Sequence, residues 1–561
     1  TPETESLFKE LVNVTLSDVV FDIDNLTMKV RQPISRTIYS EIKEYVRYEG
    51  NRIFRVKSVL FLDRICNILD KYKVNYYPSR KDIEEAKGRL LRCYITRDSG
   101  DLVIKLAVPD EYVIRKLRSA CTVKYFIERA LFDEEGNFLE TIREEREIKL
   151  LKVAEKGREL RTSVGLIDRV LKELHSLGFQ VKVDIAEKAN LSKPLSMNFE
   201  LLPHQKIAYE LWHKKKRGTI AIFTRGGKSF IAMRAIYDLK KPTLILVTTR
   251  ELAGTWKRYL NKYLGLNEHE IGYLGEGKKD IKPITIAIYN SCVKYIDLVK
   301  EKFELLICDE SHHVPANTFK NVVIKMDSLY RMALSATPKR RDGNEELLFS
   351  LCGPLIINLD YKELLTLRIV APIEVFETKF MAGEEEKLKE LIRILHKHQD
   401  EKAIVFTQYI STATKVFNSL LREGFKATLI TGSTPSMRRK RAFDEFLKGR
   451  VKVIVTTTVL DEGITVPDAE VAVIYEGSGE ARQMIQRVGR VLGYLPGKTA
   501  KVYELVDILN PREKRAYFRR KWVRELYMFP EVKEFVLKEK SGVKGETLPK
   551  FAYQARLDLE L

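Results

Sequence analysis

Residues Thr219 to Met233 read TIAIFTRGGKSFIAM, and this stretch decides the fold. A mostly apolar run leads into a loop with two glycines, and a helical apolar pattern follows the loop. A strand, a glycine-containing loop and a helix in this order provide the context that a phosphate-binding loop requires. Glycine lets the backbone approach phosphates, and the helix N-terminus presents free N–H groups. Lys228 would bring a positive charge to the outer phosphates of a nucleotide, and the Ser229 hydroxyl would bind Mg²⁺.

Five further short segments occur in the order that a nucleotide-driven motor requires. They are Leu202-Pro203-His204-Gln205, Asp309-Glu310-Ser311-His312, Ser335-Ala336-Thr337, Asp461-Glu462-Gly463 and Gln486-Arg487-Val488-Gly489-Arg490. Any one of them occurs by chance in many proteins, whereas the whole set in this order is very improbable by accident. The set predicts an ATPase that works on nucleic acid.

The acidic pair and the last arginine have distinct predicted roles in hydrolysis. An apolar strand, residues 305–308, brings Asp309 and Glu310 to the edge of the sheet that carries the phosphate loop. Asp309 would hold Mg²⁺, and Glu310 would act as the base for the attacking water. Arg490 would reach across a cleft to the γ-phosphate as an arginine finger. ATP and Mg²⁺ are the expected cofactors.

Composition limits the class of protein further. The chain has 561 residues and a formal net charge of +20, which favours a polyanionic partner, although a solvated basic surface would give the same charge. No apolar run approaches the roughly 20 residues of a membrane span, and no signal peptide is visible. The six cysteines are scattered without a CxxC pair, which argues against a zinc site or an iron–sulfur cluster. We expect a cytoplasmic protein of a prokaryote, archaeal or thermophilic.

The six segments resemble helicase superfamily 2, with a DESH version of the DExH box, over about residues 200–507. VLDEGITVPDA at 459–469 and GSGEAR at 477–482 are similar to the XPB group of double-stranded DNA translocases. Arg340, Arg341 and Asp342 match that group's Arg-Glu-Asp loop at two of three positions. Phage UvsW, which remodels branched DNA, is a near relative of the same pattern.

The resemblance implies a fold and a set of site residues. Gln205 resembles the adenine-reading glutamine, and Arg487 is either a second finger or a structural ion-pair residue. The implied nucleotide contacts are Gln205, Thr224, Gly226, Gly227, Lys228, Ser229 and Gly463, and the implied catalytic residues are Lys228, Asp309, Glu310, Gln486, Arg487 and Arg490. The implied nucleic-acid contacts are Arg250, Ser291, Arg340, Arg341, Asp342, Thr431, Gly432, Thr457 and Thr458, and the coupling residues are His312, Ser335 and Thr337. The small hydroxyls among them could instead be helix caps.

The chain departs from the family pattern at three positions of the predicted site. Arg225 stands where the family usually has glycine, Phe223 where it has proline, and Gly493 where it has a second arginine. Arg225 could crowd the phosphates, contact them or point to solvent, and our hypothesis is that it replaces the charge missing at Gly493. Only about thirty residues separate Pro372 from the strand at 403–406, which is too few for the helical thumb of XPB proteins.

The chain divides into five predicted units. Two are α+β modules at its start, each opening with a predicted hairpin, and they form either a weak internal repeat or two unrelated pieces. Two are α/β lobes in which strands and helices alternate, which predicts parallel sheets. The basic and aromatic C-terminal helix would bind a nucleic-acid backbone, pack on the second lobe, or both. The units are an N-terminal DNA-recognition module at 1–88, a second module at 89–198, RecA-like motor domains at 199–357 and 358–508, and a helical extension at 509–561.

Three functions agree with these features. The first is an ATP-dependent translocase or helicase on double-stranded DNA that acts in repair or in remodelling forked or branched DNA. The second is an ATP-gated DNA-binding scaffold with weak or no hydrolysis. The third is the motor subunit of a restriction system. A nuclease or another repair protein is the expected protein partner, and no membrane or iron–sulfur cluster is expected.

Overall fold

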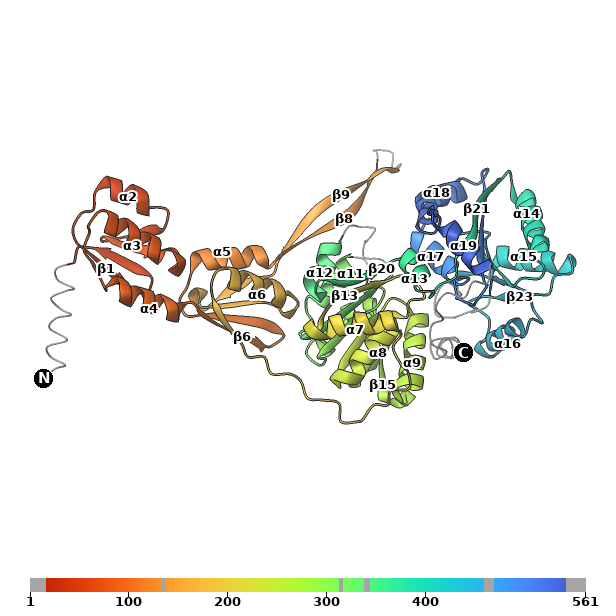
Figure 1. The fold of residues 1–561 in the computed structure, drawn as a ribbon, viewed down its shortest axis with the longest axis horizontal. Coiled ribbons are helices and arrows are strands. Elements are labelled where there is room, and N and C mark those ends of the chain that lie inside the picture. Colours follow the sequence, from red (N-terminus) through yellow and green to blue (C-terminus); the bar gives the residue numbers. More distant parts are fainter. Residues whose placement is uncertain (1–16, 133–137, 312–315, 337–343, 459–468, 541–561) are drawn as a thin grey trace.

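The computed structural model describes residues 17–132, 138–311, 316–336, 344–458 and 469–540. Two α+β modules and two α/β lobes follow one another along an elongated molecule, from the N-terminal module at one end to the second lobe at the other (Figure 1). No helix in the described ranges is both long and apolar enough to cross a membrane.

The N-terminal module contains one five-stranded sheet, ordered β3-β4-β2-β1-β5. Its elements are β1 (Val19–Asp22), β2 (Thr27–Val30), α2 (Arg36–Ile42), β3 (Val46–Gly50), β4 (Ile53–Val56), α3 (Leu62–Lys71), β5 (Tyr76–Tyr77) and α4 (Arg80–Leu90). Apolar residues of α3 alternate at helical spacing, so that Leu62, Ile65, Cys66 and Leu69 are buried against the sheet.

The second module repeats this topology in the same chain order. Its elements are β6 (Arg92–Asp98), β7 (Asp101–Leu106), α5 (Glu111–Ala120), β8 (Thr122–Phe132), β9 (Phe138–Lys149), β10 (Lys152–Ala154), β11 (Glu159–Ser163), α6 (Ile167–Ser176) and β12 (Gln180–Val183). Its sheet order, β10-β11-β7-β6-β12, matches that of the first module strand for strand. Both sheets have an antiparallel first hairpin and a last strand parallel to the first. This is the arrangement that a duplicated module would give, and we propose a duplication.

One insertion distinguishes the second module from the first. The antiparallel ribbon β8–β9 lies between α5 and β10 and projects beyond the sheet of the module (Figure 1). Its base lies against α11 (Ala316–Val323) and α12 (Glu345–Cys352) of the first lobe. There the Asn344 side chain accepts from the Phe126 N–H at 2.6 Å and donates to the Phe126 carbonyl at 3.0 Å.

The first lobe contains an eight-stranded sheet, ordered β16-β15-β17-β14-β18-β19-β13-β20. Its remaining elements are α7 (Pro203–Lys215), β13 (Arg217–Ile222), α8 (Lys228–Leu239), β14 (Thr243–Val247), α9 (Arg250–Leu264), β15 (Ile271–Gly275), β16 (Lys278–Asp280), β17 (Ile284–Ile288), α10 (Tyr289–Lys294), β18 (Leu305–Cys308), β19 (Tyr330–Ser335), β20 (Leu355–Leu359) and α13 (Tyr361–Thr366). All its strand pairs are parallel except β15–β16. Helices cover both faces, which is why β18 is apolar and buried along its whole length.

The second lobe has a six-stranded parallel sheet, ordered β21-β26-β25-β22-β24-β23. Its elements are β21 (Ile373–Met381), α14 (Glu384–Lys397), β22 (Ala403–Phe406), α15 (Ile410–Arg422), β23 (Ala427–Ile430), α16 (Ser436–Leu447), β24 (Val453–Thr456), β25 (Val471–Ile474), α17 (Ala481–Gly489), β26 (Ala500–Asp507), α18 (Pro511–Arg520) and α19 (Val532–Lys540). The single helix α14 occupies the interval between β21 and β22, where a thumb would be inserted.

The basic C-terminal segment is part of the second lobe. Arg520 of α18 is buried and pairs with Glu504 of β26 at 2.8 Å. The fully buried Lys387 of α14 pairs with Glu513 of α18, also at 2.8 Å. Tyr527, which follows α18, is fully buried among aromatic rings. Packing on the second lobe, one of the two roles left open for this segment, is therefore present.

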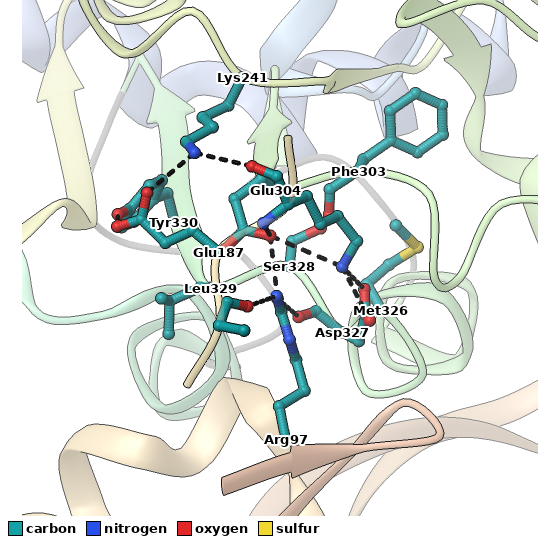
Figure 2. A network of polar contacts seen from close by, with 12 residues as sticks. Arg97, Glu187, Lys241, Phe303, Glu304, Met326, Asp327, Ser328, Leu329 and Tyr330 are labelled. Atoms are coloured by element: carbon teal, nitrogen blue, oxygen red, sulfur yellow. Dashed lines mark hydrogen bonds and ion pairs between the residues drawn. The ribbon is translucent and has the colours of Figure 1, made fainter. Parts of the chain in front are cut away.

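A network of buried charges joins the second module, the following linker and the first lobe (Figure 2). Arg97 of β6 donates to the fully buried Glu304 at 2.9 Å and to the Asp327 carbonyl at 3.1 Å. Lys188 of the linker pairs with Asp327 at 2.8 Å. Apolar residues of the module and of the lobe also share one hydrophobic core. The second module is thus packed on the first lobe and is not merely tethered by the linker.

Candidate nucleotide site between the two lobes

A cavity of about 270 Å³ lies between the two lobes and is lined by residues from both. The predicted site residues that line it are Gln205, Thr224, Gly227, Lys228, Ser229, Asp309, Glu310, Gln486 and Arg490, together with the departing positions Arg225 and Gly493. These residues come together because of the elements that carry them. The phosphate loop follows β13 and the acidic pair follows β18, while Gln486 lies in α17 and Arg490 directly after it. The structure therefore brings together residues as far apart in the chain as Gln205 and Gly493, a separation of 288 positions.

The phosphate loop needs its glycines because the backbone is packed closely there. A Cβ on Gly226 would lie 2.1 Å from the Ile222 side chain, and one on Gly227 would lie 2.2 Å from Gln205 Nε2. Gly227 also has a φ of +74°, which favours glycine, and it directly precedes α8. The loop and the N–H groups at the start of α8 form the cradle that a nucleotide's phosphates require.

Gln205 supports this loop from α7. Its Oε1 accepts from the Leu202 N–H at 3.0 Å, and its Nε2 donates to the Gly226 carbonyl at 3.2 Å. The His204 ring nitrogen lies 2.9 Å from the same carbonyl oxygen. Gln205 thus links the start of α7 to the loop, and its reading of adenine remains a prediction.

The acidic pair at the end of β18 is held by a residue that the sequence did not reveal. Trp256 of α9 is buried and donates its indole N–H to Asp309 Oδ2 at 2.7 Å. Burial, and then the neighbouring Glu310 carboxylate, raise the pKa of Asp309 to about 7. Glu310 has a φ of +48°, a strained conformation of the kind found at functional sites. Trp256 lies among the apolar residues of its helix, so no local pattern marks it as a donor to the site.

Arg487, in α17, and Arg490, directly after α17, lie in different surroundings. Gln486 and Arg490 are four residues apart, so they lie on one side of the helix and line the cavity. Arg487 is fully buried inside the second lobe, where it donates to the carbonyls of Glu476 at 2.5 Å and Thr407 at 2.9 Å. Arg487 does not line the cavity, and its hydrogen bonds to two loops of the second lobe favour a structural role over that of a second finger.

Arg225 crosses the cleft. Its Nε donates to the Gly489 carbonyl at 2.9 Å, and its Nη2 donates to the Arg490 carbonyl at 3.2 Å. The carbonyl oxygens at a helix C-terminus carry partial negative charge and attract a cation. The sequence left three positions open for this side chain: crowding the phosphates, contacting them or pointing to solvent. None of them describes it fully, because the guanidinium binds the backbone of the predicted finger segment.

Phe223, the neighbouring departure, also contacts the C-terminal part of the chain. Its ring lies 5.6 Å from the ring of Tyr527, beyond α18, and 5.9 Å from that of Tyr361 in the connection between the lobes. Phe376 of β21 stacks on Tyr527 at 5.9 Å. Both departures in the phosphate loop therefore make contacts outside the first lobe's sheet.

We expect Arg225→Gly to lower kcat by about 10-fold or more while changing the KM for ATP little. The variant removes the hydrogen bonds that fix the backbone at Arg490, and one bond to a charged group contributes about 1.5–3 kcal/mol. Steady-state ATPase kinetics would separate the two constants. Adding Gly493→Arg should restore kcat if charge alone matters, and should not if Arg225 positions the finger. Faster turnover with tighter ATP binding would show that Arg225 obstructs the site.

The predicted nucleic-acid contacts lie at strand or helix ends in both lobes. Arg250 begins α9 and is exposed, with Glu276 at 3.5 Å. Thr431 follows β23, is buried, and lies 2.9 Å from the Ser433 hydroxyl. Thr457 follows β24 and is also buried, so phosphate contacts there would rely on the backbone. The other described contacts are Ser291 in α10, Gly432 after β23 and Thr458 after β24.

Several predicted residues lie outside the described ranges. They are His312, Thr337, Arg340, Arg341, Asp342 and Gly463. Of the predicted coupling residues, Ser335 ends β19 and is buried. Ser311 of the DESH segment donates to the carbonyl of Leu334 on the same strand at 3.2 Å. This bond links the acidic segment to the strand that ends at Ser335.

Comparisons with known proteins agree with the geometry. Residues 198–340 match the family described as type III restriction enzyme, res subunit, and residues 386–492 match the helicase conserved C-terminal domain. The two matched domains lie on either side of the cavity and support a superfamily 2 helicase.

The curated relatives narrow the class. The DNA 3'-5' translocase XPB2 of Sulfurisphaera tokodaii is 28% identical over 57% of this chain and 85% of its own length. A Rad25 protein of Haloarcula marismortui is 30% identical over 58% of this chain and 55% of its own, and the DNA 3'-5' helicase XPB of Mycobacterium tuberculosis is 29% identical over 53% and 59%. The chain therefore spans little more than half of the latter two relatives. These likenesses support a helicase of the XPB (Rad25) type.

Two solved structures show a weak overall likeness to this chain. The Pyrococcus furiosus Hef helicase domain is 18% identical and covers 56% of this chain and 97% of its own, at a TM-score of 0.40. T4 UvsW is 17% identical and covers 78% of this chain and 98% of its own, at a TM-score of 0.34.

Proposed function

We propose that the protein is an ATP-dependent translocase or helicase on double-stranded DNA. The observation that carries the proposal is the cavity between the lobes, lined by Lys228, Asp309 and Glu310 from one lobe and by Gln486 and Arg490 from the other. Because the site is complete only when both lobes contribute, a change in nucleotide state acts on the separation of the lobes.

The residues present fit ATP and Mg²⁺. The loop backbone leaves no room for a Cβ at Gly226 or Gly227, as a phosphate cradle requires. Ser229 and the buried Asp309 would hold Mg²⁺, which neutralises charge on the phosphates. Lys228, whose ammonium donates to the Ile222 carbonyl at 3.0 Å, is within the same loop and would turn to the outer phosphates.

Each remaining residue has one task in hydrolysis. Glu310 accepts the proton of the attacking water, and Arg490 stabilises the charge that develops on the γ-phosphate. Trp256 donates to Asp309 Oδ2, and the Glu310 N–H donates to Asp309 Oδ1 at 2.9 Å, so both oxygens of this carboxylate are held in place. Arg225 ties the phosphate loop to the backbone of Gly489 and Arg490.

DNA is the proposed track because the chain carries a net charge of +20 and because its XPB relatives are named for action on DNA. Phosphate contacts would come from Arg250 and Ser291 on the first lobe and from the ends of β23 and β24 on the second. We further propose a role in repair or in remodelling branched DNA, with a nuclease or repair protein as partner, in the cytoplasm of a prokaryote.

A second candidate function is an ATP-gated DNA-binding scaffold. Arg225 favours it, because its bridge between the lobes can hold them together without hydrolysis. The match to a restriction-enzyme subunit over residues 198–340 supports a third candidate, the motor subunit of a restriction system.

The ATPase rate with duplex, forked, Holliday-junction and single-stranded DNA separates these functions. We expect at least a tenfold stimulation by duplex-containing DNA and little by single strands. Removing residues 1–90, up to the end of α4, together with Asp110→Asn, which removes the buried charge that Ser58 and Val59 hold, should keep the stimulation and reduce the preference for branched DNA. A cut at 198 is unsuitable, because it would remove Arg97 and Lys188 and leave Glu304 and Asp327 buried without their cations. No stimulation by any DNA would favour the scaffold.

A further inference from the structure

A second cavity, of about 380 Å³, lies on the second lobe between α18 and two loops. One loop, Gln408 and Tyr409, follows β22, and the other, Glu476 to Gly479, follows β25. Three arginines of α18 line it: Arg512, Arg515 and Arg519. We call this feature the α18 groove.

The three arginines are available to a ligand. They are spaced i, i+3 and i+7, so they share one face of α18 and extend over about 10 Å at 1.5 Å per residue. All three are exposed, and within the described ranges none has a carboxylate at ion-pair distance. By contrast Arg520, the next residue on the helix, is committed to Glu504 at 2.8 Å.

The carboxylates of the α18 groove are already engaged. Glu476 accepts from the Gln408 N–H and from the Thr412 hydroxyl, both at 3.0 Å. Glu513 accepts from the buried Lys387 through both oxygens at 2.8 Å. The charge that the groove presents is therefore positive.

Two glycines bring the loop after β25 against α18. A Cβ on Gly477 would lie 2.6 Å from the Arg520 guanidinium, and one on Gly479 would lie 2.8 Å from Arg519 Cδ. Ion pairs of Glu513 and Arg520 also anchor α18 to the lobe, so the backbone that carries the three arginines is held in place. A ligand would not have to order the helix as it binds, which lowers the entropy cost of binding.

The α18 groove continues the row of predicted phosphate contacts on this lobe. The strands β25, β22, β24 and β23 are neighbours in that order and are parallel, so their carboxyl ends share one edge. Thr431 and Thr457 follow β23 and β24 at that edge, and the loops of the groove follow β22 and β25.

We propose that the α18 groove binds the phosphodiester backbone of DNA and extends the track on the second lobe. Guanidinium groups bind phosphate oxygens through paired N–H donors, and the exposed ring of Tyr409, which is 56% accessible, can pack on a sugar or base. The proposal rests on the DNA-motor function, and it adds contacts from outside the six motor segments.

The test is the salt dependence of duplex binding by a triple variant, Arg512→Gln, Arg515→Gln and Arg519→Gln. Each phosphate contact contributes about 0.9 to the slope of log affinity against log salt, so the slope should become shallower by about 2.7. The matched control, Arg422→Gln, Lys426→Gln and Lys448→Gln, removes the same charge at the opposite edge of the same sheet, where β23 and β24 begin. It should keep the wild-type slope.

An unchanged slope in the α18 triple variant, or an equal loss in the control, would overturn the proposal. The DNA-motor function is tested separately by DNA stimulation of the wild-type ATPase, so the two failures are distinguishable. If the triple variant has a lowered Tm, the double variant Arg512→Gln and Arg515→Gln takes its place, because it keeps the packing of Arg519 against Gly479. Its slope should change by about 1.8.

Discussion

Arg490→Gln is expected to lower kcat by about 10³-fold or more, because a finger arginine stabilises charge that develops only in the transition state. Arg490 lines the cavity from the second lobe, opposite Lys228 and Glu310. ATP affinity should change little, because the ground-state contacts lie on the phosphate loop. Single-turnover hydrolysis at saturating ATP and DNA measures the effect, and equilibrium binding of a fluorescent nucleotide checks the affinity.

Arg487→Gln is the matched control for Arg490→Gln. Arg487 lies three residues earlier on α17 and donates to carbonyls inside the second lobe. Its replacement leaves those buried carbonyls without a donor, so we expect a lower Tm, whereas Arg490→Gln should leave the Tm unchanged. Near-normal turnover in Arg490→Gln would remove the finger assignment, and a loss of Tm in both variants would make both residues structural.

Glu310→Gln should leave ATP binding intact and lower turnover by about 10²-fold or more, the scale for loss of a general base. The amide keeps the shape and the hydrogen-bonding reach of the side chain but cannot accept the proton of the attacking water. Glu251→Gln, an exposed acid in the first turn of α9, is the control and should behave as wild type. If Glu310→Gln hydrolyses ATP at a near-normal rate, the assignment of the acidic pair is wrong.

Most residues that line the cavity between the lobes could be predicted from the sequence, because the motifs that contain them are local. The phosphate loop is defined by glycines whose Cβ would clash, and the acidic pair by an apolar strand that ends at the right edge. Alternation of strands and helices likewise predicted two parallel-sheet lobes, as observed. These features depend on spacing along a few residues, which a sequence displays directly.

Directions of side chains could not be predicted, because they depend on partners far along the chain. Arg225 donates to carbonyls more than 260 residues away in the chain. Arg487 points into the second lobe while Arg490 lines the cavity, and this difference depends on how α17 is rotated about its axis as it packs on the lobe. The basic run after Val506 gave no sign that Arg520 would be buried beside Glu504 while Arg519 stays exposed. Trp256 is indistinguishable in sequence from its apolar neighbours, although its indole N–H reaches Asp309.

The shared core of the second module and the first lobe has a mechanical consequence. Module and lobe are joined by Arg97, Lys188 and a common set of buried apolar side chains, so we expect them to move as a unit if the two lobes open and close. We therefore expect a nucleotide-driven movement to displace the second lobe relative to the second module and the first lobe together. A DNA contact made by the N-terminal half would serve as a fixed point of reference, and its distance from the cleft would not change during a step.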